Sequence, residues 1–230
     1  MQIQQLDFVE GAKSAKGIAV IIDVFRAFTT ACYCFAGNAR AIYPAGDIEQ
    51  AIALANQLDN TLLIGERNGK KLPGFHLNNS PTEVQNTVIA HKNIIHTTHA
   101  GTRGLVNALG ADRVLTGALV NAKATADFIL RCQPRDVSLV RMGWKAQTPT
   151  DEDNICAEYI AALLAGENFD EGNIHDFLRQ SPCSRRFFDP AETGSPASDF
   201  ELCTQLNRFE FALQLHLEDE CPPRIVKASV

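Results

Sequence analysis

The chain of 230 residues lacks several features that would assign it at once to a class of proteins. It has no excess of positive charge: 21 Lys and Arg stand against 27 Asp and Glu, which gives a formal net charge of −6. Affinity for nucleic acids rests on clustered Lys and Arg, so this balance excludes a general nucleic-acid binder. An anion pocket built from a few arginines stays compatible with it.

The sequence also lacks long apolar runs and the pattern of a signal peptide. No apolar stretch approaches the roughly 18 residues of a membrane-spanning helix. The first residues, Met1-Gln-Ile-Gln-Gln-Leu-Asp7, lack the basic and apolar regions of a signal peptide. We therefore expect a cytoplasmic protein that does not bind a membrane.

The seven cysteines lack the spacing of a disulfide framework or a zinc site. They are odd in number, scattered along the chain, and include no CxxC pair. Free cysteine is commonly a small buried hydrophobe, so we expect most of the seven in the core.

What is present is the composition of an ordinary globular protein, with 45% hydrophobic and 21% charged residues. The length predicts a single domain over residues 1–230, or two closely joined halves. A surplus of apolar residues on the predicted helices leaves a homodimer open.

Short apolar runs alternate with amphipathic stretches along the chain. Such strand, turn and helix units predict an α/β protein with a mostly parallel sheet and helices on both faces. We expect strands at 1–10, 18–22, 41–44, 61–64, 93–98, 114–117, 137–142 and 208–217. We expect helices at 27–35, 48–58, 82–90, 101–109, 122–131, 151–164 and 199–206, with loops at 11–17 and 70–81.

Four polar motifs follow predicted strands: Asp23-x-x-Arg26, Gly65-Glu66-Arg67, the segment 101–104 (Gly-Thr-Arg-Gly) and the acidic segment 151–153. If the strands are parallel, all four lie at one edge of the sheet, where open α/β sheets bind ligands. Each motif alone has a structural explanation, as a helix cap, a surface ion pair or a helix first turn rich in acids. Their coincidence at one edge favours a functional site.

The carboxylates and arginines of these motifs suit a phosphoryl-transfer site. Asp23, Glu66 and one of the acids at 151–153 are hard oxygen ligands of the kind that Mg²⁺ prefers. The guanidinium groups of Arg26 and Arg67 match tetrahedral oxyanions. An anion held beside Mg²⁺ is what phosphoryl transfer requires.

The segment 101–104 adds backbone N–H groups, the Thr102 hydroxyl and the Arg103 charge, which together suit a phosphate or sulfonate. His99 lies beside this segment and is a candidate for proton transfer, whereas His96 fits a core residue. Cys183-Ser-Arg-Arg186 does not fit a phosphatase nucleophile loop, because it lacks a glycine-rich cradle.

Five motifs in order resemble the 2-phosphosulfolactate phosphatase (ComB-like) family. The matching pieces are Ile22-Asp-Val-Phe-Arg-Ala-Phe-Thr-Thr30, Gly65-Glu-Arg-Asn-Gly69, Gly74-Phe-His-Leu-Asn-Asn-Ser-Pro81, Thr97-Thr-His-Ala-Gly-Thr-Arg103 and the Glu152-Asp153 helix start. The resemblance covers residues 18 to 165. It implies a three-layer α/β/α fold and a Mg²⁺-dependent hydrolase that removes phosphate from 2-phospho-3-sulfolactate, on a route to coenzyme M.

Carried over by motif, the resemblance implies catalytic roles for Asp23 and Glu66, to which the residues add His99. It implies Asp23, Glu66 and Asp153 as metal ligands. The substrate-binding residues that it implies are Arg26, Arg67, Asn79, Ser80, Thr102 and Arg103. The choice among Asp151, Glu152 and Asp153 as metal ligand stays open.

The chain departs from the family pattern where Thr97-Thr-His99-Ala100-Gly101-Thr replaces the usual Thr-Thr-Asn-Gly-Thr, and Asn68 and the segment 141–143 differ as well. The resemblance therefore implies phosphosulfolactate or a similar small phosphorylated acid as the expected substrate. The attacking group is a water or a carboxylate such as Asp23. A non-catalytic metabolite-binding protein, and an isomerase or lyase acting on a small phosphorylated acid, are the alternatives.

Overall fold

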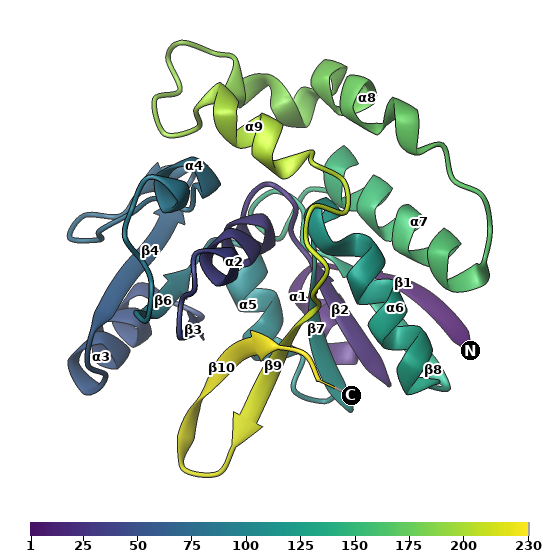
Figure 1. The fold of residues 1–230 in the computed structure, drawn as a ribbon, viewed down its shortest axis with the longest axis horizontal. Helices are drawn as coiled ribbons and strands as arrows, with labels where there is room; N and C mark the ends of the chain where they lie inside the picture. Colours follow the sequence, from purple (N-terminus) through teal and green to yellow (C-terminus); the bar gives the residue numbers. More distant parts are fainter. Residues whose placement is uncertain (230) are drawn as a thin grey trace.

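The strand β2 (Ile18–Ile22) is buried on both faces, as its apolar sequence predicts. Ile18, Val20 and Ile22 belong to one apolar cluster, and Ala19 and Ile21 to another. Successive side chains of a strand point to opposite faces, so helices cover both sides of this strand. The computed structural model, which describes residues 1–229, confirms an α/β fold with three layers (Figure 1).

The sheet contains two groups of parallel strands joined by an antiparallel hairpin. Within residues 1–229 the strand order is β1-β8-β2-β7-β9-β10-β3-β6-β4-β5. Neighbours are parallel from β1 to β7 and from β3 to β4, which confirms a mostly parallel sheet. The strands are β1 (Gln2–Asp7), β3 (Ala41–Ala45), β4 (Thr61–Arg67), β5 (Lys70–Lys71), β6 (Asn93–Thr97), β7 (Arg113–Gly117), β8 (Asp136–Arg141), β9 (Leu213–Glu218) and β10 (Cys221–Lys227).

The helices divide between the two faces of the first strand group. One face packs against α1 (Phe8–Ser14), α2 (Ala27–Ala36) and α5 (Gly101–Asn107). The other packs against α6 (Ala122–Cys132) and α7 (Asp151–Ala165), while α3 (Ile48–Gln57) covers β3 and β6. The remaining elements are α4 (Pro81–Gln85), α8 (Ile174–Gln180), α9 (Ala197–Cys203) and the 3₁₀ turns η1 (Leu119–Asn121), η2 (Glu171–Asn173) and η3 (Pro182–Phe187).

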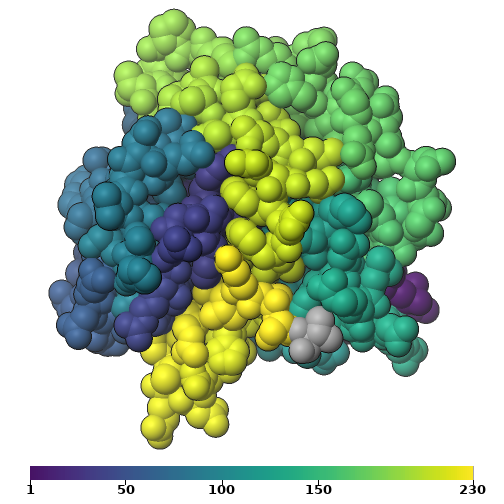
Figure 2. Space-filling model, viewed as in Figure 1, coloured from purple at the N-terminus to yellow at the C-terminus, as the bar shows by residue number. Residues whose placement is uncertain are grey.

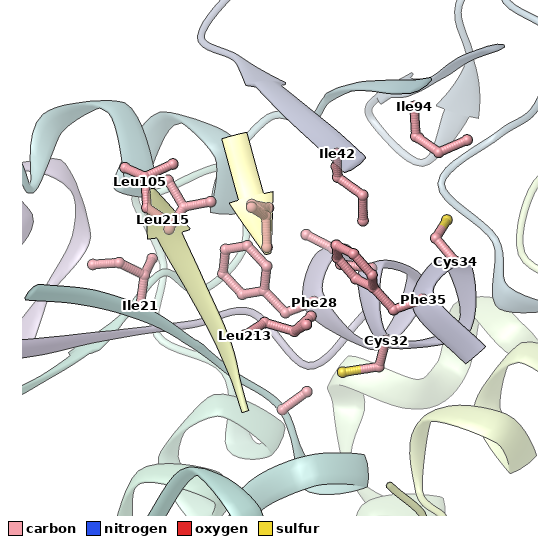
Figure 3. Packing of buried hydrophobic residues seen from close by; sticks show 14 of the residues in the cluster. Ile21, Phe28, Cys32, Cys34, Phe35, Ile42, Ile94, Leu105, Leu213 and Leu215 are labelled. Atoms are coloured by element: carbon pink, nitrogen blue, oxygen red, sulfur yellow. The ribbon is translucent and has the colours of Figure 1, made fainter. Parts of the chain in front are cut away.

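The hairpin β9–β10 fills the space between the two strand groups. It pairs antiparallel with β7 on one side and, through Ile225 opposite Ile42, with β3 on the other. Phe28 on α2 shares an apolar cluster with Leu213 and Leu215 of the hairpin (Figure 3). The hairpin's far end projects from the molecule (Figure 2).

The loop expected at residues 11–17 is confirmed only for residues 15–17, because α1 occupies Phe8–Ser14. Gly11 argued for a loop in the sequence, but it serves close packing instead. A Cβ at Gly11 would lie 2.9 Å from the Cβ of Leu6, so only glycine lets this helix approach β1.

The strand expected at 208–217 begins only at Leu213, and its partner β10 was not expected at all. Pro222 and Pro223 argue against a strand, because proline cannot donate to a ladder. In the structure the register shifts between Cys221 and Arg224, so the two prolines sit in an irregularity of the ladder. The helix expected at 82–90 is also shorter, since α4 ends at Gln85.

Within the described part of the chain, no helix is both long and apolar enough to cross a membrane.

Replacing Phe28 by alanine should destabilise the fold strongly. Its side chain is fully buried between α2 and the hairpin, and truncating a buried phenylalanine costs about 3–5 kcal/mol. Urea unfolding of Phe28→Ala tests this. The control is Val88→Ala, whose side chain is 82% exposed and whose loss should cost less than about 0.5 kcal/mol. Equal losses for the two variants would contradict the packing described.

Candidate active site

A small cavity lies where the carboxyl ends of β2, β4, β6 and β8 meet. Its volume is about 30 Å³, and we call it the inner cavity. One probe-sized water needs about 10–15 Å³, so the inner cavity has room for a few atoms only. It is lined by Asp23, Phe25, Arg26, Glu66, Asn68, Gly69, Asn79, His99, Ala100, Gly143, Trp144, Lys145 and Arg186.

A second, larger cavity adjoins the first, and we call it the outer cavity. Its volume is about 510 Å³, which lies in the range of sites for small molecules. The two cavities share Asn68, Gly69, Trp144 and Arg186 as walls. The outer cavity is therefore the approach to the inner one.

Asp23 follows β2 directly and is held by backbone N–H groups on both sides. Its Oδ1 accepts a hydrogen bond from the N–H of Ala27 at 3.1 Å, and its Oδ2 accepts one from the N–H of Gly101 at 2.8 Å. A Cβ at Gly101 would lie 2.8 Å from Oδ2, so this approach requires glycine. The carboxylate thus joins the start of α2 to the start of α5.

Glu66, near the end of β4, is fixed in the same way. Its Oε1 accepts from the N–H of His99 and its Oε2 from the N–H of Gly69, both at 2.8 Å. The side chain is buried and faces the inner cavity. Asp23 and Glu66 therefore reach one cavity from the two strand groups, as the four-motif argument predicts.

Asp153 lies in the first turn of α7 and, like Asp23 and Glu66, accepts hydrogen bonds from two backbone N–H groups. Its Oδ1 accepts from the N–H of Val24 at 2.9 Å and its Oδ2 from the N–H of Gly143 at 2.8 Å. Both oxygens thus fix the loops that carry Asp23 and Trp144, and the side chain is absent from the lining of the inner cavity. Metal binding by Asp153 stays a prediction.

Buried carboxyl groups in this region resist ionisation. Burial raises the pKa of Asp23 to about 6, the hydrogen bond from Ala27 opposes the shift, and Glu66 and Glu152 add to it. Burial also raises the pKa of Asp153 well above its ordinary value, with further contributions from Glu152 and Asp23. The site therefore concentrates acidic groups that a cation would stabilise.

Arg26 lines the inner cavity, but its charge is already paired. Its Nη1 donates to Asp199 at 2.5 Å and to the carbonyl of Gly194 at 2.9 Å. Its Nη2 donates to the carbonyl of Gly69 at 3.4 Å. The side chain is 2% exposed, so this ion pair holds the segment 194–199 over the site. A substrate contact for Arg26 stays a prediction.

The segment 101–104 and Arg67 do not line the inner cavity. The N–H groups of Gly101 and Thr102 donate to Asp23 and to the Thr98 hydroxyl, and are thus used within the protein. Arg67 donates to the carbonyl of Glu66 and the hydroxyl of Thr97, and Arg103 lies near it. Substrate binding by Arg67, Thr102 and Arg103 stays a prediction.

Of the two site residues predicted in the loop 70–81, only one lines the inner cavity. Asn79 lines the inner cavity, and its Oδ1 lies 3.1 Å from Nε2 of the buried His96. Ser80 caps α4 and donates to Asp199 at 2.7 Å, so its hydroxyl is used in the structure. Substrate binding by Asn79 and Ser80 stays a prediction.

His99 lines the inner cavity. Within residues 1–229 its Nδ1 is buried and has no hydrogen-bond partner. Burial lowers the pKa of His99, although Glu66 opposes the shift.

Several residues that line the inner cavity were not among the predicted site residues, and they include Trp144, Lys145 and Arg186. Arg186 belongs to η3, in a stretch of weak periodicity where no element was expected. In the motif Cys183-Ser-Arg-Arg186 the second arginine lines the cavity, although the cysteine does not fit a nucleophile. Trp144 and Lys145 follow β8, so the rule that found Asp23 at a strand end could also have found them.

The carboxylates fit a magnesium ion that uses few protein ligands. Among residues 1–229, no three His, Cys, Asp or Glu side chains are arranged to hold a metal ion between them. Mg²⁺ commonly uses one or two carboxylates and completes its shell with water and substrate oxygens. Asp23 and Glu66 face one cavity, and Glu66 is among the charges that raise the pKa of Asp23. A cation between them would relieve that repulsion.

The fold and site together define an α/β/α enzyme whose acidic and basic side chains meet at the carboxyl ends of its strands. The pattern of the 2-phosphosulpholactate phosphatase family matches residues 5–216, and the chain belongs to this family.

Relatives named as probable 2-phosphosulfolactate phosphatases support this assignment. The chain is 35% identical to one from Carboxydothermus hydrogenoformans, over 95% of each chain. It is 30% identical to one from Bacillus subtilis, over 89% of this chain and 90% of the relative. It is 33% identical to one from Prochlorococcus marinus, over 83% of this chain and 85% of the relative.

His96 should make the protein sensitive to acid. Burial lowers its pKa from 6.5 to about 4, so the folded state takes up this proton later than the unfolded state as the pH falls. His96 therefore costs stability as the pH drops from 6.5 towards 4. His96→Gln keeps a donor for Asn79 but cannot titrate.

Denaturant unfolding of both proteins from pH 7.5 to pH 4 measures the effect. The stability of His96→Gln relative to the wild type should rise by up to about 3 kcal/mol over this interval. A difference that does not change with pH would contradict a buried, neutral His96.

Proposed function

We propose that this protein is a Mg²⁺-dependent phosphatase. Its substrate would be 2-phospho-3-sulfolactate or a similar small phosphorylated acid, which is hydrolysed to the hydroxy acid and phosphate. The observation that carries the proposal is the meeting of Asp23 and Glu66 in one cavity, in a chain of the 2-phosphosulfolactate phosphatase family. The relatives named for this activity support it.

Asp23 and Glu66 would hold the metal ion. When bound, Mg²⁺ would neutralise phosphoryl oxygens and orient the reacting groups. Backbone N–H groups fix both carboxylates, so their oxygens keep a defined position as the substrate arrives. Asp153 supports the metal site from behind by holding the loops at Val24 and Gly143.

His99 is suited to proton transfer. Its lowered pKa keeps the ring neutral at pH 7, so Nδ1 or Nε2 can accept a proton. The attacking group is either a water molecule or the Asp23 carboxylate. A cytoplasmic location, a homodimer and a role on a route to coenzyme M stay predictions.

Phosphate release from phosphosulfolactate and phospholactate, with and without Mg²⁺, tests the proposal. The wild type should release phosphate only with the metal. Asp23→Asn and Glu66→Gln should each lower kcat/KM by about 100-fold or more, because charge stabilisation at a reacting phosphoryl group is lost. Glu158→Gln is the matched control, since Glu158 is exposed on α7 and should keep full activity.

Full Mg²⁺-dependent activity in both site variants would show that the metal assignment is wrong. Conversion of the substrate without phosphate release would favour an isomerase or lyase. Binding of the substrate without any conversion, across metals and pH, would favour a metabolite-binding protein.

A further inference from the structure

Arg186 stands at the junction of the two cavities and is a wall of both. Its guanidinium lies over the rings of Trp144 and Phe187, 4.8 Å and 5.0 Å from their centroids. Its Nη2 donates to the carbonyl of Phe25 at 2.7 Å. The side chain is therefore fixed in place before any ligand arrives.

Within the described part of the chain, the charge of Arg186 is not paired in a salt bridge, although Glu152, Glu66 and Asp23 act on it electrostatically. It forms no ion pair within residues 1–229, and its buried Nε has no hydrogen-bond partner among them. A charge or hydrogen-bond donor that is buried without a partner costs free energy unless a ligand supplies that partner. Arg26 differs in this respect, because Asp199 neutralises it.

The sizes of the cavities decide where a substrate fits. The inner cavity, at about 30 Å³, has room for a metal ion or a water but not for an organic phosphate. The outer cavity, at about 510 Å³, has room for the carbon skeleton. A substrate group that contacts the carboxylates of the inner cavity, and is bonded to a carbon skeleton in the outer cavity, has to lie at the junction of the two, beside Arg186.

The charges of the outer cavity point to the same place. Asp151, Glu152 and Glu192 also line the outer cavity, and Glu152 and Arg186 act on each other electrostatically, so an anion is attracted only where it meets Arg186. Three cations line the two cavities. Arg26 is paired with Asp199, and Lys145 lines only the inner cavity. Arg186 is the cation placed to meet an anion that enters through the outer cavity.

We propose that Arg186 binds a tetrahedral oxyanion of the substrate at the junction of the two cavities, with the carbon skeleton in the outer cavity. The oxyanion is the phosphoryl group or a sulfonate, because a guanidinium fork suits either one. The inference rests on the proposed function for the identity of the substrate, but the binding of oxyanions can be tested without turnover.

Calorimetric titration with inorganic phosphate, sulfolactate and lactate, in the presence of Mg²⁺, tests this proposal. Arg186→Gln should raise the Kd for phosphate or sulfolactate by about 10- to 100-fold, the range expected when a hydrogen bond to a charged group is lost. Arg186→Lys should recover part of the binding, since it keeps the charge but not the fork. Lactate, which has no tetrahedral oxyanion, should respond to neither change.

Arg185→Gln is the matched control, because Arg185 is an exposed neighbour that lines neither cavity. A loss confined to phosphate assigns Arg186 to the phosphoryl group, and a loss confined to sulfolactate assigns it to the sulfonate. Unchanged Kd values for both in Arg186→Gln and Arg186→Lys, or no binding of either anion by the wild type, would overturn the proposal.

The two proposals fail in different ways. If the wild type binds these anions through Arg186 but releases no phosphate from any ester, the phosphatase proposal fails and the anion site stands. If the wild type releases phosphate and the Arg186 variants keep its kinetics and anion binding, only the anion site fails.

Discussion

The buried ion pair of Arg26 and Asp199 connects the parts of the chain that enclose the site. Arg26 follows β2 and also donates to the carbonyls of Gly69 and Gly194, while Asp199 accepts from Ser80. Burying such a pair costs desolvation, and removing one partner typically costs about 3–5 kcal/mol. The turn after β4, the cap of α4 and the segment that precedes α9 thus depend on one pair of charges.

The carboxylates of the site also connect separate parts of the chain. Asp23, Glu66 and Asp153 each accept two backbone N–H groups from separate loops. Such bonds fix the side chains and stabilise their ionised form, whereas burial opposes ionisation. All three carboxylates therefore connect separate loops, and Asp23 and Glu66 also face the inner cavity, where the proposed cation would stabilise them.

Site residues could be predicted where an apolar run marks a strand and a polar residue follows at its end. Asp23 and Glu66 could be predicted because each ends an apolar run, and parallel strands bring such ends together. The sheet was predictable for the same reason. The hairpin was less so, because Pro222 and Pro223 argue against a strand that a register shift accommodates.

Arg186 and the pairing of Arg26 could not be predicted from the pattern. Both depend on a segment of weak periodicity that folds back over the site, and the partners in question are far apart in sequence: 161 residues for Arg186 with Phe25 and 173 for Arg26 with Asp199. Local propensity contains no information on such contacts. The sequence around Arg26 shows no sign of its partner Asp199, and nothing near Arg186 in the sequence indicates that it lines the site.

The central claim is that Asp23 and Glu66 together hold one divalent cation in the inner cavity. A crystal structure of the protein soaked with Mn²⁺, with anomalous data collected to locate the ion, tests it most directly, because Mn²⁺ prefers the same oxygen ligands as Mg²⁺. The account predicts one strong anomalous peak within bonding distance of a carboxylate oxygen of Asp23 and of Glu66. A peak bound elsewhere, or an inner cavity without any peak at saturating Mn²⁺, would contradict it.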